Sequence, residues 1–266
     1  MSTLAYTVGD STTMLRRNLK RLQRYPSLTL MLAGMPIVFL LLFVYVFGGQ
    51  LGHGLSRALA GGHSGRAGYL NYVTPGILLM TVAAAVQGTA IVVAMDMTGG
   101  IIDRFRTMAI ARSAVLTGHV LASFIQTFLS IGVIVGVAVA LGFRPVAGLL
   151  AWLGAIGVMA LFSLALIWLA TALGLAARSV ETASNTPMFL TFLPFLGSGF
   201  VPASSMPAGL RQFAEYQPFT PTTETLRGLL TGTPIGTNAI VAVAWSIGIA
   251  LASYLWARRL YANRRA

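Results

Sequence analysis

The stretch LTLMLAGMPIVFLLLFVYVF, residues 28–47, decides the fold class, because it is apolar over a length that fits a membrane. About 20 apolar residues in a helix cross the hydrocarbon core of a bilayer, which is about 30 Å thick. Pro36 lies inside the stretch, and membrane helices tolerate proline. The stretch therefore predicts a spanning helix and not the core helix of a soluble domain.

Five more apolar stretches follow along the 266-residue chain. The chain is 56% hydrophobic and 9% charged, whereas a soluble domain carries about 25% charged residues. The predicted fold class is an all-α polytopic membrane protein with six transmembrane helices within residues 28–257, and with a glycine-rich loop after the first helix. The predicted spans are residues 28–47, 72–95, 120–141, 146–176, 186–201 and 239–256.

The net charge of +12 is concentrated outside these spans. Thirteen of the 18 Lys and Arg residues lie on the side of the two termini, and five lie in the opposite loops. Cytoplasmic segments are enriched in Lys and Arg, so the tails, residues 1–27 and 258–266, are predicted to be cytoplasmic. The basic residues do not alternate with aromatic ones as in nucleic-acid sites, so we expect contact with anionic lipid and no nucleic acid.

The first tail contains TTMLRRNLKRLQRYP, residues 12–26, which has helical period. Its apolar side chains share one face, namely Met14, Leu15, Leu19 and Leu22. Its basic side chains surround the rest, namely Arg16, Arg17, Lys20, Arg21 and Arg24. This pattern predicts a helix lying on the membrane surface. A signal peptide is disfavoured, because the apolar run that follows is too long and no small-residue cleavage site comes after it.

A charged stretch, GGIIDRFRTMAIAR, residues 99–112, separates the second and third spans. Asp103 and its three arginines would together cost roughly 10 kcal/mol at the bilayer centre, so the stretch must lie outside it. Between Ile101 and Ala109 the apolar and polar residues alternate with helical period, which predicts a short amphipathic helix. The pattern alone leaves two alternatives open: a helix that caps the bundle against lipid headgroups, or a helix that docks on a soluble partner.

The sequence lacks the residues that several kinds of functional site require. The chain has no cysteine, which excludes disulfides, thiolate zinc sites and cysteine nucleophiles. His53 and His63 are too isolated for us to expect a metal site. The single lysine, Lys20, stands outside any Gly-Lys-Ser/Thr motif, so the chain has no P-loop of its own. The sequence LGSGF, residues 196–200, lacks the first glycine of the Gly-x-Ser-Gly motif of intramembrane serine proteases, and an enzyme is not expected.

Residues 202–236 form a semi-polar stretch between the fifth and sixth spans. Pro207 and Pro221 suit the first turns of two short helices, and Gly232 suits a C-terminal cap. Two pairs stand at ion-pair spacing, Arg211 with Glu215 and Glu224 with Arg227. Ten residues of helix reach about 15 Å, half of the hydrocarbon thickness. The stretch is either a surface loop or a hairpin that enters the outer leaflet and returns.

Three stretches carry a resemblance to a known family: YLNYVTPGILLM at 69–80, GGIIDRFRTMAIARSAVLTG at 99–118, and GFVPASSMPAGLRQFAEYQPFTPTTETLRGLLTGTP at 199–234. Together they resemble the permeases of type-2 ABC exporters, above all the daunorubicin/doxorubicin-resistance permease family. The start, RRNLKRLQRYP at 16–26 followed by the first span, also fits this family. The resemblance covers nearly the whole chain in the right order.

The resemblance implies a bacterial plasma-membrane exporter in which two permeases, alike or different, pair above two ATP-binding cassette subunits. ATP and magnesium bind in those partner subunits, and this chain binds no cofactor. The cargo is a hydrophobic drug, antibiotic or lipid. Residues 202–236 correspond to a re-entrant helical hairpin at the exit, and residues 12–25 to the family's connecting helix.

The resemblance also assigns residues by position. A cytoplasmic coupling helix corresponds to Ile101, Asp103, Arg104, Phe105, Arg106 and Met108. The first, second and fifth spans face the substrate path, where the candidates are Phe39, Phe43, Gln87, Phe192 and Phe195.

An ion-coupled secondary transporter without an ATPase is the alternative function. Such transporters keep ionisable groups near the bilayer midplane. The predicted spans contain none, and Asp96 and His119 stand at predicted cytoplasmic ends.

Overall fold

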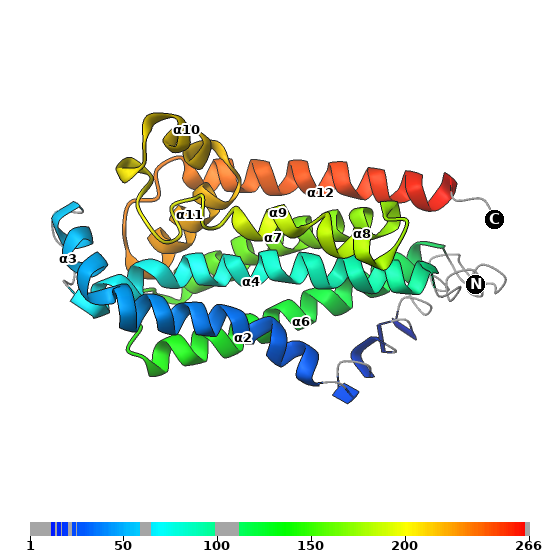
Figure 1. Cartoon of the computed structure of the whole chain (residues 1–266), viewed down its shortest axis with the longest axis horizontal. Helices are drawn as coiled ribbons and strands as arrows, with labels where there is room; N and C mark the ends of the chain where they lie inside the picture. The colour runs from blue at the N-terminus through cyan, green and yellow to red at the C-terminus, as the bar shows by residue number, and fades with distance from the viewer. Residues whose placement is uncertain are drawn as a thin grey trace.

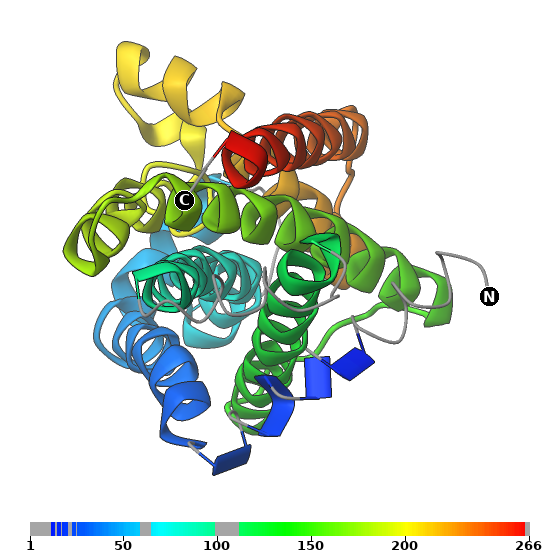
Figure 2. The same cartoon turned by 90° about the vertical axis from the view of Figure 1, so that its right-hand side faces the viewer.

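Helix α4 (Gly65–Thr98) runs through the middle of the molecule in the computed structural model, and three other long helices, α2 (Pro26–Leu42), α6 (Arg112–Ala140) and α7 (Leu149–Ala176), pack on it (Figures 1 and 2). The structure describes residues 12–13, 15–16, 18–20, 23–24, 26–58, 65–98 and 112–263. Across these ranges every regular element is helical. The side chains of α4 are apolar or small on every face. A helix of this kind is stable when it is buried among other helices.

The first span is longer than the sequence predicts. α2 (Pro26–Leu42), the π-helical turn η1 (Phe43–Phe47) and α3 (Gly48–Ala58) follow one another without a break. The glycine-rich segment after residue 47 was predicted to be a loop, and this prediction is wrong for α3. Its glycines are compatible with a helix because α3 packs closely on α4, and a side chain at Gly52 would collide with the backbone of Gly65.

Three further long helices complete the bundle: α6 (Arg112–Ala140), α7 (Leu149–Ala176) and α12 (Asn238–Asn263). α6 packs on α2, α4 and α7, and α12 packs on α7. We call the end that holds the start of α2 and the last residues of α4 and α12 the inner end. The opposite end, which holds α3, is called the outer end (Figure 1).

Within the described residues, five helices are long and apolar enough to cross a membrane. Their outward faces carry large apolar side chains that nothing in the bundle covers, such as Met31 (77% exposed), Leu150 (84%) and Ile240 (74%). A soluble monomer rarely exposes apolar surface on this scale, whereas a bilayer accommodates it. A multi-pass membrane protein is therefore confirmed, although the helices extend beyond the predicted spans at several ends.

The fifth predicted span, residues 186–201, is not one helix. The chain forms α8 (Val180–Asn185), then α9 (Met188–Phe192), and then turns up to residue 200. Pro187 separates the two short helices, because proline supplies no N–H to continue the helical ladder. The segment still runs along α4 from the inner end, where Ala183 packs on Ala94, to the outer half of α4. We call residues 180–201 the broken segment.

Two short helices follow at the outer end, as the sequence predicts. α10 (Ala208–Tyr216) begins after Pro207, and α11 (Phe219–Thr231) ends at Gly232, whose φ of +76° and N–H bond to the Gly228 carbonyl close the helix. α10 is mostly exposed, whereas α11 is buried against α4, α7 and α12. Whether this pair enters the outer leaflet stays a prediction.

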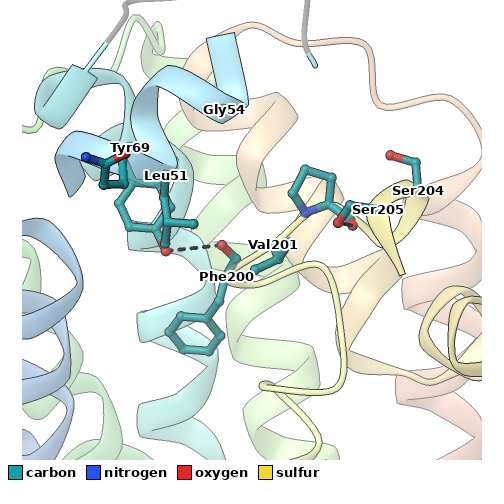
Figure 3. A pocket seen from close by; sticks show the side chains of 9 residues that line it. Leu51, Gly54, Tyr69, Phe200, Val201, Ser204 and Ser205 are labelled. Atoms are coloured by element: carbon teal, nitrogen blue, oxygen red, sulfur yellow. Dashed lines mark hydrogen bonds between the residues drawn. The ribbon is translucent and has the colours of Figure 1, made fainter. Parts of the chain in front are cut away.

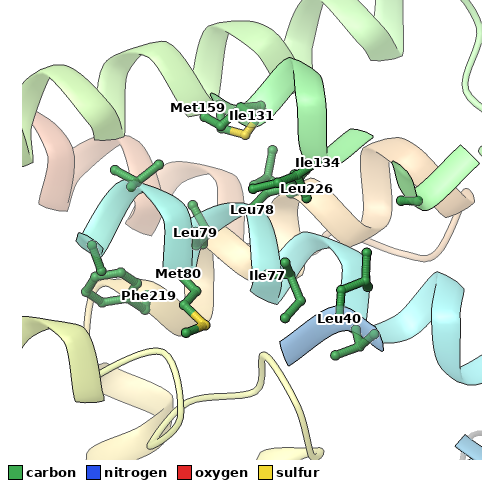
Figure 4. Packing of buried hydrophobic residues seen from close by; sticks show 14 of the residues in the cluster. Leu40, Ile77, Leu78, Leu79, Met80, Ile131, Ile134, Met159, Phe219 and Leu226 are labelled. Atoms are coloured by element: carbon green, nitrogen blue, oxygen red, sulfur yellow. The ribbon is translucent and has the colours of Figure 1, made fainter. Parts of the chain in front are cut away.

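The apolar core surrounds the outer half of α4 (Figure 4). Ile134 of α6, Phe219 and Leu226 of α11, and Leu40 of α2 are buried around Ile77 and its neighbours on α4. Leu40, Ile77, Ile134 and Leu226 are each fully buried. This packing fixes the position of α4 and therefore of the segments that bind to it.

Candidate functional site

An aromatic cluster joins the first span to the broken segment. Phe39 of α2 meets Phe195 edge-on with ring centres 5.4 Å apart, and Phe195 stacks on Phe200 at 4.7 Å. Phe43 lies 4.6 Å from Phe200 and 5.7 Å from Phe47. Offset and edge-on ring pairs of this kind are favourable beyond their buried area. Three of the predicted path residues, Phe39, Phe43 and Phe195, are thus brought together by the fold.

The other two predicted path residues lie elsewhere. Gln87 donates from its amide nitrogen to the Ser184 carbonyl at 3.1 Å, so it joins α4 to α8 nearer the inner end. Phe192 is 52% exposed on α9, and it takes part in none of the ring pairs found among the described residues. The structure therefore separates the five candidates into an aromatic cluster and two outlying positions. Phe200, which the sequence analysis did not select, belongs to the cluster.

A buried cation holds the end of the broken segment against α4. Arg227 of α11 is 5% exposed, and its guanidinium donates to the Tyr72 carbonyl at 3.2 Å and the Ser198 carbonyl at 2.8 Å. The guanidinium also lies 3.7 Å from the centre of the Tyr72 ring and pairs with Glu224 at 2.6 Å. A buried charge is tolerated only when it is paired and hydrogen-bonded in this way.

Further side chains bind the carbonyls of the same turns. The Tyr69 hydroxyl donates to the Phe200 carbonyl at 3.1 Å, and the Tyr72 hydroxyl donates to the Ser198 carbonyl at 3.0 Å. Gln217 donates to the Leu193 carbonyl at 2.9 Å. Irregular backbone is tolerated at membrane depth only where protein groups satisfy it. We call this network of Tyr69, Tyr72, Gln217 and Arg227 the outer junction.

The sequence analysis identified only part of the outer junction. The pair of Glu224 with Arg227 was predicted from its spacing and is confirmed, as is Arg211 with Glu215 at 2.8 Å on the exposed face of α10. The role of Arg227 as a backbone clamp was missed. The available signal was the run of helix breakers in LPFLGSGF, residues 193–200, because irregular backbone in a membrane chain requires polar partners.

A cavity of about 440 Å³ opens beside the outer junction. Leu51 and Gly54 of α3 and Tyr69 of α4 form one side, and Val201 and Ser204 face them across the opening, with Phe200 below (Figure 3). The cavity is therefore continuous with the aromatic cluster through Phe200. It has the size and mostly apolar lining of a small-molecule site.

At the inner end, Asp96 of α4 and His119 of α6 form a buried pair with 3.2 Å between the carboxylate and the imidazole nitrogen Nε2. The two side chains are 7% and 5% exposed. Both residues were predicted to stand at cytoplasmic ends of spans, and both lie toward the inner end of their helices. The predicted coupling helix lies outside the described residues, so its assignment stays a prediction.

The first-tail helix is described at some of its positions. Arg16, Lys20 and Arg24 are helical and exposed, whereas Arg17 and Arg21 lie outside the described residues. Contact of this helix with the membrane surface stays a prediction. Among the residues that the structure describes, no group of three or more His, Cys, Asp or Glu side chains is arranged to hold a metal ion.

Comparison with known proteins identifies the family. The model of the ABC-2 type transporter family matches residues 11–231, and the chain belongs to this family. The chain is 27% identical over 263 residues to the daunorubicin resistance ABC transporter permease protein DrrB1 of Streptomyces coeruleorubidus, across 98% of this chain and 89% of that protein. It is 27% identical over 175 residues to the probable doxorubicin resistance ABC transporter permease protein DrrC of Mycobacterium tuberculosis, across 64% of this chain and 63% of that protein. The predicted family is therefore confirmed.

Proposed function

We propose that this chain is the permease subunit of an ATP-driven exporter of hydrophobic drugs, antibiotics or lipids. The observation that carries the proposal is the similarity to DrrB1 over 98% of the chain, together with the family match over residues 11–231. DrrB1 is named for daunorubicin resistance within an ABC transporter. The membrane-length helices and the uncovered apolar faces of the bundle are consistent with a permease.

The energy for export comes from a separate ATP-binding cassette subunit, which binds the ATP and magnesium. The chain itself has no Gly-Lys-Ser/Thr motif with which to bind a nucleotide phosphate. The partner docks on the stretch between α4 and α6, with Asp103, Arg104 and Arg106 facing it. A second permease, alike or different, completes the transporter in the bacterial plasma membrane, with both termini in the cytoplasm.

The cargo path passes the aromatic cluster, where Phe39, Phe43 and Phe195 converge. The contacts that support this path are two ring pairs between the first span and the broken segment, with ring centres 5.4 Å and 4.6 Å apart. Aromatic rings supply apolar contact to a hydrophobic cargo without the desolvation cost of polar groups. Gln87 and Phe192 are the weaker candidates, because the structure separates them from this cluster.

The proposal is tested by purifying the tagged chain from its native host in mild detergent and assaying vanadate-sensitive ATPase activity. We expect the activity to copurify, and we expect it to disappear when Asp103→Arg is combined with Arg104→Asp. The matched control combines Arg211→Glu with Glu215→Arg, which reverses an exposed pair on α10 and should leave the ATPase bound. A folded protein that copurifies no ATPase would contradict the proposal.

One observation favours the alternative, an ion-coupled transporter. Asp96 and His119 lie buried within helices that are long enough to span, which the sequence boundaries did not predict. Asp96 stands two residues before the end of α4, about 3 Å along the helix axis, whereas coupling ions bind near the midplane. Transport that is lost with Asp96→Asn and that needs no ATPase would favour this alternative.

A further inference from the structure

The cavity at the outer end lies between α3, the start of α4 and the end of the broken segment, and it adjoins the aromatic cluster at Phe200. It measures about 440 Å³, within the range of sites that enclose a drug-sized molecule. Tyr69 and Phe200 are buried, 1% and 4% exposed, so these two walls are fixed by packing. A bond from the Tyr69 hydroxyl to the Phe200 carbonyl joins the two walls directly (Figure 3).

The described residues that line the cavity carry no formal charge. Its accessible apolar side chains are those of Leu51, Val201 and Pro202, because Tyr69 and Phe200 are almost fully buried. An ionised group of a ligand would give up part of its hydration against this lining without finding a counter-charge among these residues. The lining therefore selects an uncharged molecule.

Two polar groups at the cavity could orient a ligand by hydrogen bonding. The Gln50 amide and the Ser204 hydroxyl line the cavity, and neither has a hydrogen-bond partner among the described residues. The Tyr69 hydroxyl and the Ser205 hydroxyl, in contrast, are already bonded to carbonyls. A ligand with a carbonyl or hydroxyl group thus has one amide and one hydroxyl to bind.

The local backbone is built to keep this space open. The π-helical turn η1 inserts an extra residue just before α3, and such turns are frequent at functional sites. Gly54 lines the cavity without filling it, and a side chain built there would meet nothing within 4 Å. The close contact of Gly52 with Gly65 holds α3 against α4 beside this opening.

We propose that the outer-end cavity binds one uncharged, largely apolar molecule that carries a carbonyl or hydroxyl group. Its apolar part packs on Leu51, Val201 and Pro202, and its polar group bonds to Gln50 or Ser204. The inference that cargo occupies this cavity before its release rests on the proposed export function. The binding itself requires neither ATP nor a partner subunit, and it is tested separately from export.

The test is photolabelling of the purified permease in phosphatidylcholine nanodiscs with benzophenone, an uncharged aromatic ketone, followed by peptide mass spectrometry. We expect the label to concentrate on Leu51, Val201 and Pro202. An excess of Nile red, an uncharged planar competitor, should reduce this labelling. Label spread evenly over the outward faces of α2 and α12 would overturn the proposal, and so would labelling at the cavity that Nile red does not reduce, because such labelling would not come from a saturable site.

A filling variant sharpens the result. In Gly54→Trp the indole occupies the cavity, and we expect labelling there to fall about tenfold, equivalent to about 1.4 kcal/mol of lost binding. The matched control is Gly209→Trp on α10, which also has open space around it and lies outside the cavity lining. Equal cavity labelling in Gly54→Trp and the unchanged chain would overturn the proposal. Cavity labelling in a permease that shows no ATP-driven export would instead disprove only the proposed function.

Discussion

At its outer end α4 is joined to the irregular part of the broken segment through bonds to backbone carbonyls, whereas near its inner end Asp96 pairs with a side chain of another regular helix. The Tyr69 and Tyr72 hydroxyls and the Arg227 guanidinium all bind carbonyls at the outer end. At the inner end, Asp96 pairs with His119 between two regular helices. Contacts to irregular backbone determine the course of the chain, while contacts between side chains of regular helices can be exchanged without unravelling either helix.

The difference assigns different tasks to the two ends. The outer junction keeps the broken segment on α4, so that its loss should lower the stability of the whole bundle. The inner end adjoins the stretch where we propose that the ATPase docks, and the contacts there should influence transport more than folding. The variants below test this contrast, from the largest expected loss of stability to the smallest.

Arg227→Ala should have the largest effect. It removes the guanidinium bonds to the Tyr72 and Ser198 carbonyls and leaves the partly exposed Glu224 carboxylate unpaired, and losing a buried, paired cation in this way costs about 3 kcal/mol. We expect a fall of many degrees in the thermal unfolding midpoint of the detergent-purified permease. An unchanged midpoint would mean that the outer junction does not hold the broken segment.

Gly76→Ala should have the next largest effect. A methyl group on Gly76 would lie 2.5 Å from the Gly199 carbonyl oxygen, and overpacking of this kind costs about 1–3 kcal/mol. The matched control is Gly88→Ala on the same helix, where nothing lies within 4 Å and where alanine favours the helix by up to about 1 kcal/mol. The two unfolding midpoints should move in opposite directions, and parallel shifts would contradict the close packing of the broken segment on α4.

Asp96→Asn should destabilise the protein only moderately. Asparagine keeps the shape and one acceptor oxygen, so we expect a loss of about 1 kcal/mol with the fold intact. ATP-driven export should be reduced but not abolished, measured as drug accumulation in cells that express the complete transporter. Complete loss of transport with normal ATPase association would favour an ion-coupled mechanism.

Arg211→Ala should have the smallest effect. Its pair with Glu215 is about half exposed, at 50% and 44% of the side-chain areas, and exposed pairs of this spacing are worth about 0.3–0.5 kcal/mol. The unfolding midpoint should stay within error of the unchanged chain. A large fall would show that α10 depends on this pair and that burial does not distinguish it from Arg227.

The sequence predicted the class of fold because apolar runs of membrane length have few alternative uses. It also predicted α10, α11 and both ion pairs, since proline, glycine and charge spacing act locally. It failed on α3, because glycine-rich sequence favours a loop unless close packing on another helix compensates for the lost propensity.

The outer junction was not predictable in the same way. Phe200, Tyr69 and Arg227 are 27 to 158 residues apart in the chain, and no spacing rule joins positions so distant. Pro187 and Pro194 lie within the fifth predicted span, but membrane helices tolerate proline, so their presence did not argue against one spanning helix. Tertiary contacts decide the structure here, because α4 and α11 supply the polar groups that bind the non-helical backbone of the broken segment.

The most direct test of the account is the uptake of hydrophobic drugs into inside-out membrane vesicles that contain this permease and its copurified ATPase. The account predicts uptake that requires ATP, is inhibited by vanadate and persists when a protonophore removes the proton gradient. It also predicts that the combination of Asp103→Arg with Arg104→Asp abolishes uptake. Uptake that follows the proton gradient without ATP would contradict the account.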